Sequence, residues 1–103
     1  MNDYNTNGFE LQLTPEFIAD YQKLIKKDRS LIKKFTKALE LLSSNPYHNS
    51  LHSHKVDTID NNNVWSSSVT GDIRVIWIYG TNQKMVIVLL ESGTHSGANK
   101  VYK

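Results

Sequence analysis

Residues 64–79 read VWSSSVTGDIRVIWIY, two runs rich in β-branched and aromatic residues on either side of Gly71-Asp72. A two-residue loop with glycine first is typical of a type II′ turn, so the segment predicts a β-hairpin with strands at 64–70 and 73–79. In that register Val69 would lie opposite Arg74. One face of the hairpin would then carry Trp65, Val69, Arg74, Ile76 and Ile78.

Downstream of this hairpin the sequence predicts one more strand. GTNQ at 80–83 is typical of a turn, and KMVIVLL at 84–90 is a continuous apolar run with strand-forming residues. The chain then closes with ESGTHSGANKVYK at 91–103. The abrupt change from an apolar run to Gly-Thr-His-Ser predicts a loop at the end of a buried strand. This loop would present His95.

Upstream of the hairpin the sequence predicts a strand and two helices. FELQLT at 9–14 alternates apolar and polar residues, which indicates a half-buried strand. Thr14 and Pro15 form a helix start, because threonine caps helices and proline suits the first helical position. An apolar stripe extends this helix to about Asp28. Ser30 is the expected N-cap of a second helix, which Asn45-Pro46 ends, and the short connection predicts a helical hairpin.

Residues 45–63 form a long polar connection, with an extended stretch expected around 51–56. Three of the chain's histidines lie in it, and a connection of this length in a small domain is often functional. The order β-α-α-β-β-β predicts an α+β domain, a helical hairpin packed on a mostly antiparallel four-stranded sheet. We expect residues 1–103 to form a single domain, with a flexible N-terminus at 1–8.

The composition favours an ordinary globular protein of the cytoplasm. The chain has 103 residues, 39% hydrophobic and 21% charged, and no cysteine, so neither a disulfide framework nor a cysteine-based zinc site is available. The polar N-terminus does not resemble a signal peptide, and the longest apolar run is too short to cross a bilayer. The histidine spacing matches no metal-binding motif, so we expect no metal and no cofactor.

The net charge is only +2, but the basic residues are unevenly distributed. Seven of the twelve lysines and arginines fall within residues 23–37. They lie mostly opposite the apolar stripes of the two predicted helices, and therefore coat the outside of the helical hairpin. Such a surface can attract phosphate groups or an acidic partner, and it can equally be a solvated helical face.

The ordered set of segments resembles the RelE/ParE superfamily of toxins from bacterial type II toxin–antitoxin systems. Four segments carry the resemblance: LTPEFIADYQKLIKKD, ALELLSSNP, VWSSSVTGDIRVIW and LLESGTHSGANKVY. The last is similar to the end of the RelE and YafQ-like branch. The resemblance implies a helical hairpin against a curved antiparallel sheet. It also implies cleavage of mRNA, usually on the ribosome, and neutralisation by an antitoxin protein.

The resemblance implies a set of catalytic residues. Metal-free RNA cleavage to a 2′,3′-cyclic phosphate and a 5′-hydroxyl needs a base, an acid and a cation at the phosphate. His95 matches the family's C-terminal histidine, and Arg74 matches an arginine that contacts the scissile phosphate. Tyr102 matches a terminal aromatic residue that stacks on a base or transfers a proton. His54, preferred over His48 and His52, is the second candidate for proton transfer.

The chain departs from the family pattern at Glu91, where relatives place an arginine before the Gly-Thr-His segment. This acid could serve as a base, hold Arg74 in place, or indicate altered activity. Trp65 and Ser67 stand where RelE carries lysines on its second strand. Asp72 matches an acidic residue of the YafQ-like branch, but aspartate also suits a tight turn.

The candidate partners follow from the same resemblance. A cognate antitoxin, mRNA and the ribosomal RNA are the expected partners, with a toxin–antitoxin hetero-oligomer on operator DNA and no membrane. The alternatives are a ParE-like inhibitor of DNA gyrase, and a decayed toxin that keeps only antitoxin binding. RNA or ribosome binding is assigned to a set of basic residues. These are Lys26, Lys27, Lys33, Lys34, Lys37 and Lys55.

Overall fold

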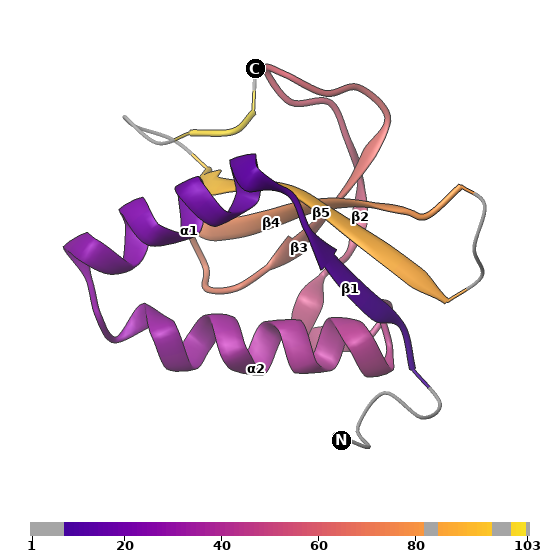
Figure 1. Cartoon of the computed structure of the whole chain (residues 1–103), viewed down its shortest axis with the longest axis horizontal. Coiled ribbons are helices and arrows are strands. Elements are labelled where there is room, and N and C mark those ends of the chain that lie inside the picture. The colour runs from indigo at the N-terminus through magenta and orange to yellow at the C-terminus, as the bar shows by residue number, and fades with distance from the viewer. Residues whose placement is uncertain (1–7, 82–84, 96–99, 103) are drawn as a thin grey trace.

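A computed structural model of the chain describes residues 8–81, 85–95 and 100–102. Two helices, α1 (Pro15–Lys27) and α2 (Leu31–Ser44), pack on one face of a five-stranded sheet (Figure 1). The strands are β1 (Glu10–Leu13), β2 (His54–Val56), β3 (Val64–Ser68), β4 (Ile73–Tyr79) and β5 (Val86–Thr94), and a 3-10 turn, η1, covers Asn49–Leu51.

The sheet has the order β1-β5-β4-β3-β2, and β1 pairs with β5 in parallel while the other pairs are antiparallel. The predicted α+β class and the mostly antiparallel sheet are therefore confirmed. The predicted strand number was too low by one, because β2 forms inside the long polar connection and adds to the edge of β3. This strand lies within the stretch 51–56 that was expected to be extended.

The helix start at Thr14 is as predicted. Thr14 Oγ1 accepts a hydrogen bond from the Phe17 N–H at 3.2 Å and also donates to the Leu89 carbonyl at 2.8 Å. The cap thus fixes α1 to β5. Ser30 takes the predicted N-cap position of α2, but its backbone is helical and its side chain forms no capping hydrogen bond. Asp28 Oδ1 accepts from both the Ser30 N–H and the Ser30 hydroxyl instead, at 3.0 and 2.6 Å.

The hairpin register differs from the prediction by one residue. Trp65 lies opposite Trp77, and Ser68 lies opposite Arg74, because three residues, 70–72, form the loop. Thr70 belongs to the turn because its Oγ1 accepts from the N–H groups of Asp72 and Ile73, at 3.1 and 2.9 Å. A shift of one residue moves side chains to the other face. Trp65 therefore lies on the face opposite to the predicted one, whereas Arg74, Ile76 and Ile78 still share a face.

The two faces of the sheet carry separate clusters. The inner face, which the helices cover, holds the stacked pair Trp65 and Trp77, with ring centroids 5.5 Å apart. Phe17 and Phe35 pack beneath them from α1 and α2, each 1% exposed. Burying a side chain of this size contributes about 1.5–3 kcal/mol. The outer face, on the opposite side, holds a smaller cluster formed by Val64, Ile76 and Val101.

The last strand is longer than predicted. β5 begins at Val86 and continues to Thr94, so Gly93 and Thr94 belong to the strand and His95 follows directly. A β-bulge lies opposite Ile76 and Trp77, where Ile76 pairs with Glu91 and Trp77 with Leu89. The extra residue, Leu90, reverses the alternation beyond it, so Glu91 shares the outer face with Ile76.

Several expectations concern residues outside the described part of the chain. The expected flexible N-terminus lies there except for Gly8, where a Cβ would come within 2.6 Å of the Ser43 carbonyl oxygen. The turn at 80–83 is only partly described. Among the described residues, neither helix is long and apolar enough to cross a bilayer.

Candidate functional site

Three candidate residues meet around Ser66 on the outer face of the sheet. Ser66 is fully buried and lies directly opposite His54 on β2. Directly opposed residues have Cβ atoms about 5 Å apart. Arg74 is its diagonal neighbour, because Ser66 pairs with Ile76 and Ser68 pairs with Arg74. Tyr102 reaches the same serine from the C-terminal segment, and its hydroxyl shares a 2.5 Å hydrogen bond with Ser66 Oγ.

His95 joins this group through Tyr102. The two rings meet edge to face, with centroids 5.0 Å apart and an interplanar angle of 70°. The β3–β4 hairpin loop fixes the backbone of His95. The His95 N–H donates to the Asp72 carbonyl at 2.9 Å and lies 3.3 Å from Asp72 Oδ1. Its imidazole is exposed at the end of β5. Asp72 therefore lies in the turn, as the sequence favoured, and also fixes the backbone of the candidate histidine.

Arg74 presents a cation that has no carboxylate partner in the described part of the chain. It forms no ion pair with Asp72 or Glu91, and Nη1 donates to Ser68 Oγ. Its Nε is buried and has no hydrogen-bond partner among the described residues. An unsatisfied buried donor costs about 1–3 kcal/mol. The guanidinium therefore keeps donor capacity and full charge for an anion such as a phosphate group.

The imidazole of His54 is oriented by its own segment. The ring is exposed, and Nδ1 lies 2.8 Å from the carbonyl oxygen of His52. A carbonyl only accepts, so Nδ1 carries the proton and Nε2 of the neutral ring holds a free lone pair. His48, in contrast, uses Nδ1 to accept from the Ser50 N–H at 3.1 Å and caps η1. His52 is the left-handed residue that ends this turn.

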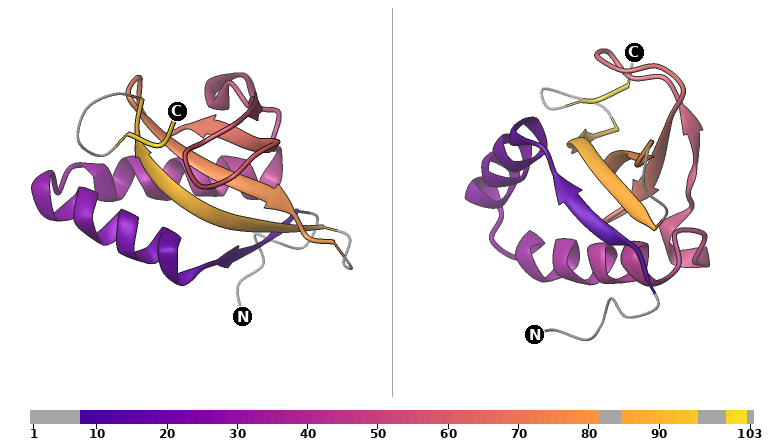
Figure 2. Two further views of the ribbon diagram at one scale, coloured as in Figure 1. Left: turned by 90° about the horizontal axis from the view of Figure 1, so that it is seen from above. Right: turned by 45° about the vertical axis from the view of Figure 1, so that its right-hand side comes forward.

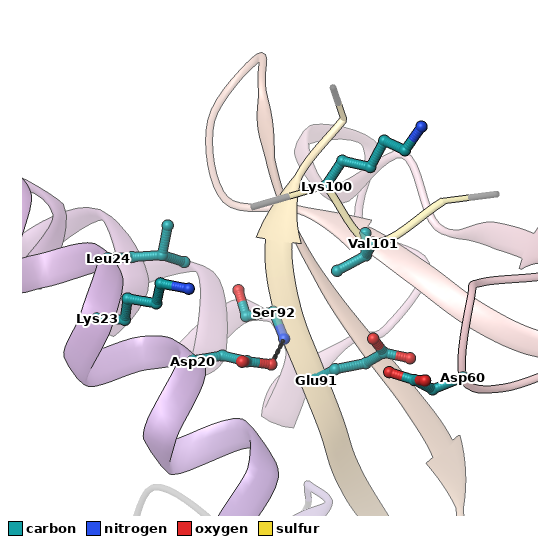
Figure 3. A pocket seen from close by; sticks show the side chains of 8 residues that line it. All are labelled: Asp20, Lys23, Leu24, Asp60, Glu91, Ser92, Lys100 and Val101. Carbon is teal, nitrogen blue, oxygen red and sulfur yellow. Dashed lines mark hydrogen bonds between the residues drawn. The ribbon is translucent and has the colours of Figure 1, made fainter. Parts of the chain in front are cut away.

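Glu91 lies on the same face but does not contact Arg74. Its carboxylate oxygen Oε2 accepts hydrogen bonds from Thr58 Oγ1 and Asn61 Nδ2, both at 2.6 Å. The side chain is 8% exposed and lines a pocket of about 190 Å³ with Asp20, Asp60 and Lys100 (Figure 3). The structure thus separates this acid from Arg74, and the alternative in which Glu91 holds that arginine in place is wrong.

The six candidate lysines are exposed but do not form one surface. Lys33, Lys34 and Lys37 line a groove of about 380 Å³ between α2 and the β3–β4 hairpin, with Ser68 on the opposite wall. Lys26 and Lys27 lie in the last turn of α1. Lys55 pairs with Trp65 and lies over its ring at 5.3 Å, so it points to the inner face, away from its neighbour His54.

An aromatic group continues from Lys55 along the inner face. Tyr79 packs edge to face against Trp77, and its hydroxyl donates to the Tyr47 hydroxyl at 3.0 Å. Burial, together with this hydrogen bond, raises the pKa of Tyr79. Tyr79 therefore stays protonated at neutral pH. Both tyrosines lie on the face opposite to His54 and Arg74, and they take no part in the outer-face site.

Sequence reasoning missed the two serines that organise this site. Ser66 and Ser68 accept or share the hydrogen bonds of Tyr102 and Arg74, and both belong to the unremarked run SSS in β3. The available signal was the polar run itself within a predicted strand, since a polar side chain that becomes buried, as Ser66 does, needs a partner. The third serine, Ser67, accepts from Trp77 Nε1 at 2.8 Å on the inner face.

Taken together, the outer face combines one unpaired guanidinium, two imidazoles and a phenol. These groups come from β2, β4, the end of β5 and the C-terminal segment. They offer a fixed positive charge, a proton acceptor at His54 Nε2 and an exposed second imidazole. Such a set can bind a phosphodiester and move protons at near-neutral pH. No group of three or more metal-ligating side chains gathers anywhere in the described residues.

Comparison with known proteins gives structural neighbours only, because no family model and no curated protein sequence matches the chain. A YoeB/ParE toxin from Agrobacterium tumefaciens superposes with a TM-score of 0.65 at 16% identity, covering 85% of this chain and 100% of that one. YafQ from E. coli gives a TM-score of 0.55 at 17% identity, with 84% and 92% covered.

A metal-bound toxin from Helicobacter pylori is also similar, with a TM-score of 0.58 at 16% identity. It covers 84% of this chain and 94% of that one. At these identities the likeness concerns architecture. The TM-scores and the coverage agree on one point: this chain has the RelE/ParE-like toxin fold.

Proposed function

We propose that the chain is the toxin of a type II toxin–antitoxin system and acts in the cytoplasm as an endoribonuclease that cleaves mRNA on the ribosome. The fold, shared over almost the full length with three toxins, supports the toxin role. One observation carries the enzymatic part. Four candidate residues from separate parts of the chain, His54, Arg74, His95 and Tyr102, converge on Ser66 and its neighbours.

The proposed reaction is a metal-independent transfer within the RNA strand. A base removes the proton of the 2′-hydroxyl, the 2′-oxygen attacks phosphorus, and the 5′-oxygen departs with a proton from an acid. The products are a 2′,3′-cyclic phosphate and a 5′-hydroxyl. His54 is the proposed base because its Nε2 lone pair is free, and His95 is the proposed acid. Arg74 stabilises the charge that develops on the phosphate oxygens.

Tyr102 has two proposed contributions at this site. Its ring can stack on a base of the substrate, since an aromatic side chain supplies about 1–3 kcal/mol per stacked base. Its hydroxyl, held by Ser66, fixes the ring against His95. The second effect limits the orientations of His95, and general acid catalysis depends on such orientation.

The proposed partners are a cognate antitoxin, mRNA and ribosomal RNA, with a hetero-oligomer on operator DNA as a further assembly. A groove of about 550 Å³ between β1 and α2 supports an antitoxin surface. Leu11 and Leu39 line it, and β1 is the edge of the sheet. An edge strand beside an apolar groove suits a segment that folds on binding. The lysines of α2 supply charge for RNA.

Cell-free translation of a reporter mRNA tests the proposal. Added toxin should produce new 5′ ends carrying hydroxyl groups at codons in the ribosomal A site. The variants H54A, R74A and H95A should lose this cleavage, whereas H48Q, a neighbouring histidine with a local capping role, should retain it. Absence of new 5′ ends together with stabilised gyrase–DNA complexes would support the gyrase inhibitor instead. Absence of both, with antitoxin binding intact, would indicate a decayed toxin.

A further inference from the structure

Glu91 is the acid that departs from the family pattern, and it is almost fully buried, at 8% exposed. The bulge at Leu90 turns it to the outer face, beneath the segment 57–63. Its two hydrogen bonds to Thr58 and Asn61 both end on Oε2. Hydrogen bonds to an ionised acceptor are about twice as strong as neutral ones, so the carboxylate is a firm anchor for this loop.

The anchored loop is closed on itself. The Thr58 N–H donates to the Asn61 carbonyl at 2.6 Å, and the Asn61 N–H donates back to Thr58 Oγ1 at 2.9 Å. The threonine hydroxyl has a single hydrogen, and the 2.6 Å contact with Glu91 takes it in preference to the 3.2 Å contact with the Asn61 carbonyl. Thr58 is fully buried, so without the carboxylate its hydroxyl hydrogen would have only the weaker contact.

The same loop holds the C-terminal segment against the sheet. Thr58 forms an antiparallel bridge with Tyr102, and the Ile59 N–H donates to the Val101 carbonyl at 2.9 Å. On its other side the Val101 N–H donates to the Thr94 carbonyl at 3.1 Å. The segment 100–102 is therefore held between the loop and the end of β5 (Figure 2). This placement brings Tyr102 onto Ser66 and against His95.

We infer that Glu91 is a positioning residue, which fixes Tyr102 in the outer-face site by anchoring the loop 57–61 under the C-terminal segment. It acts through Thr58 and Asn61 and transfers no proton itself. The role differs from that of an arginine at this position, which would add charge at the phosphate. Activity as a readout rests on the proposed RNA cleavage, whereas the anchoring itself does not.

Amide hydrogen exchange measured by NMR tests the anchoring without any substrate. The reporters are the N–H groups of Thr58, Ile59 and Val101, with amides of β4 as reference. In E91A and T58V the reporters should exchange at least about tenfold faster, as expected for loss of a charge-assisted hydrogen bond. E91Q keeps an acceptor oxygen and should stay within about threefold of the wild type. D60N is the matched control: it also removes a carboxylate charge from the same pocket and loop, but no hydrogen bond of the Asp60 side chain is found among the described residues, so the exchange rates should not change.

A double-mutant cycle of Glu91 and Tyr102 tests whether Glu91 affects the candidate site through Tyr102. E91A should lower kcat for mRNA cleavage about tenfold or more, and should have little further effect in a Y102A background, because residues that act through one another are not additive. E91Q should recover most of the wild-type rate, with an unchanged pH profile.

Three results would overturn the inference: unchanged reporter exchange in both E91A and T58V, additive losses in the cycle, or loss of activity in E91Q with wild-type exchange. The last would make Glu91 a proton-transfer group. If the wild-type protein cleaves no RNA, the proposed function fails, and the exchange measurements still decide the anchoring.

Discussion

Arg74 is the residue whose environment departs most from what stability alone would favour. Its charge has no carboxylate partner, and its buried Nε has no acceptor among the described residues. A phosphate group bound at the guanidinium would neutralise this charge. The charge without a carboxylate in the described residues is thus consistent with a group that is completed by its substrate.

Replacement of Arg74 by methionine should separate activity from stability. Arg74→Met removes the unsatisfied donor while keeping an unbranched side chain, so we expect an unchanged or slightly higher melting temperature. Cleavage should fall by about 100-fold or more, the usual loss when a charge-stabilising donor is removed. Thermal unfolding and single-turnover cleavage measure the two effects. A variant that is strongly destabilised, or that still cleaves at the wild-type rate, would contradict this view of Arg74.

For single residues, the sequence predicted which side chains belong to the candidate site better than it predicted their contacts. His54, Arg74, His95 and Tyr102 were named through resemblance, and the structure brings them to one face; their chemical roles stay predictions. The contacts of Glu91 were not predictable, because Thr58 and Asn61 lie about thirty positions away in a connection without a pattern. Serine in a strand likewise gives no signal of which long-range partner satisfies it, as Ser66 illustrates.

Among the elements, the β3–β4 hairpin shows a turn preference of two residues that is overridden by the hydrogen bonds of a neighbouring side chain. Gly71-Asp72 alone favours a two-residue loop, but Thr70 adds two side-chain hydrogen bonds and enlarges the loop to three residues. The bulge at Leu90 was equally hidden, because an apolar run such as MVIVLL shows no alternation that could reveal a change of phase. The helices, whose caps and stripes are local, were predicted to within a residue at all four of their ends.

The start of α1 connects a local cap to the sheet, and its loss should be measurable. Thr14→Ala removes both the acceptor for the Phe17 N–H and the donor to the Leu89 carbonyl. We expect the free energy of unfolding to fall by about 1–2 kcal/mol, the upper range for a helix cap. Thr14→Ser keeps both hydrogen bonds and serves as the control. Urea unfolding followed by circular dichroism gives the difference, and equal stability of the alanine variant would refute the connection.

The connection between α1 and α2 should respond to acid. The hydroxyl of Ser30 first, then its N–H, and then the charge of Lys34 lower the pKa of Asp28 below its ordinary value. A lowered folded-state pKa gives stability that is present above the unfolded pKa and is lost as pH falls through the folded pKa. Carboxyl NMR titration should show this low value, and Ser30→Ala should raise it. An Asp28 pKa that Ser30→Ala leaves unchanged would show that Ser30 is not the cause.

For the whole molecule, the division into two faces separates stability from the proposed activity. The inner face and the two helices contain the large core, whereas the outer face carries the candidate site above a small apolar cluster. Substitutions on the outer face therefore leave most of the buried area intact. The same division leaves the outer sides of both helices uncovered by other described elements (Figure 1). The exposed lysines at 26, 27, 33, 34 and 37 belong to these helices.

Three of those lysines line the groove between α2 and the hairpin. Ser68 lies in its wall and accepts a hydrogen bond from Arg74, so the wall opposite Lys33, Lys34 and Lys37 includes a residue that contacts the candidate site. An RNA strand that reaches Arg74 can follow this groove. Lys26 and Lys27, in the last turn of α1, do not line the groove.

Two matched charge variants should separate these surfaces. The triple variant K33Q/K34Q/K37Q should weaken association with ribosomes and reduce the salt dependence of binding, by about 2 in the slope of log K against log salt if each lysine meets one phosphate of a single strand. K26Q/K27Q should have a smaller effect on both, although it also removes positive charge. Sedimentation binding at several salt concentrations, with an uncleavable mRNA in the A site, measures the slopes. Equal slopes for the two variants would show that the charge acts by general attraction, and that the groove does not guide the strand to Arg74.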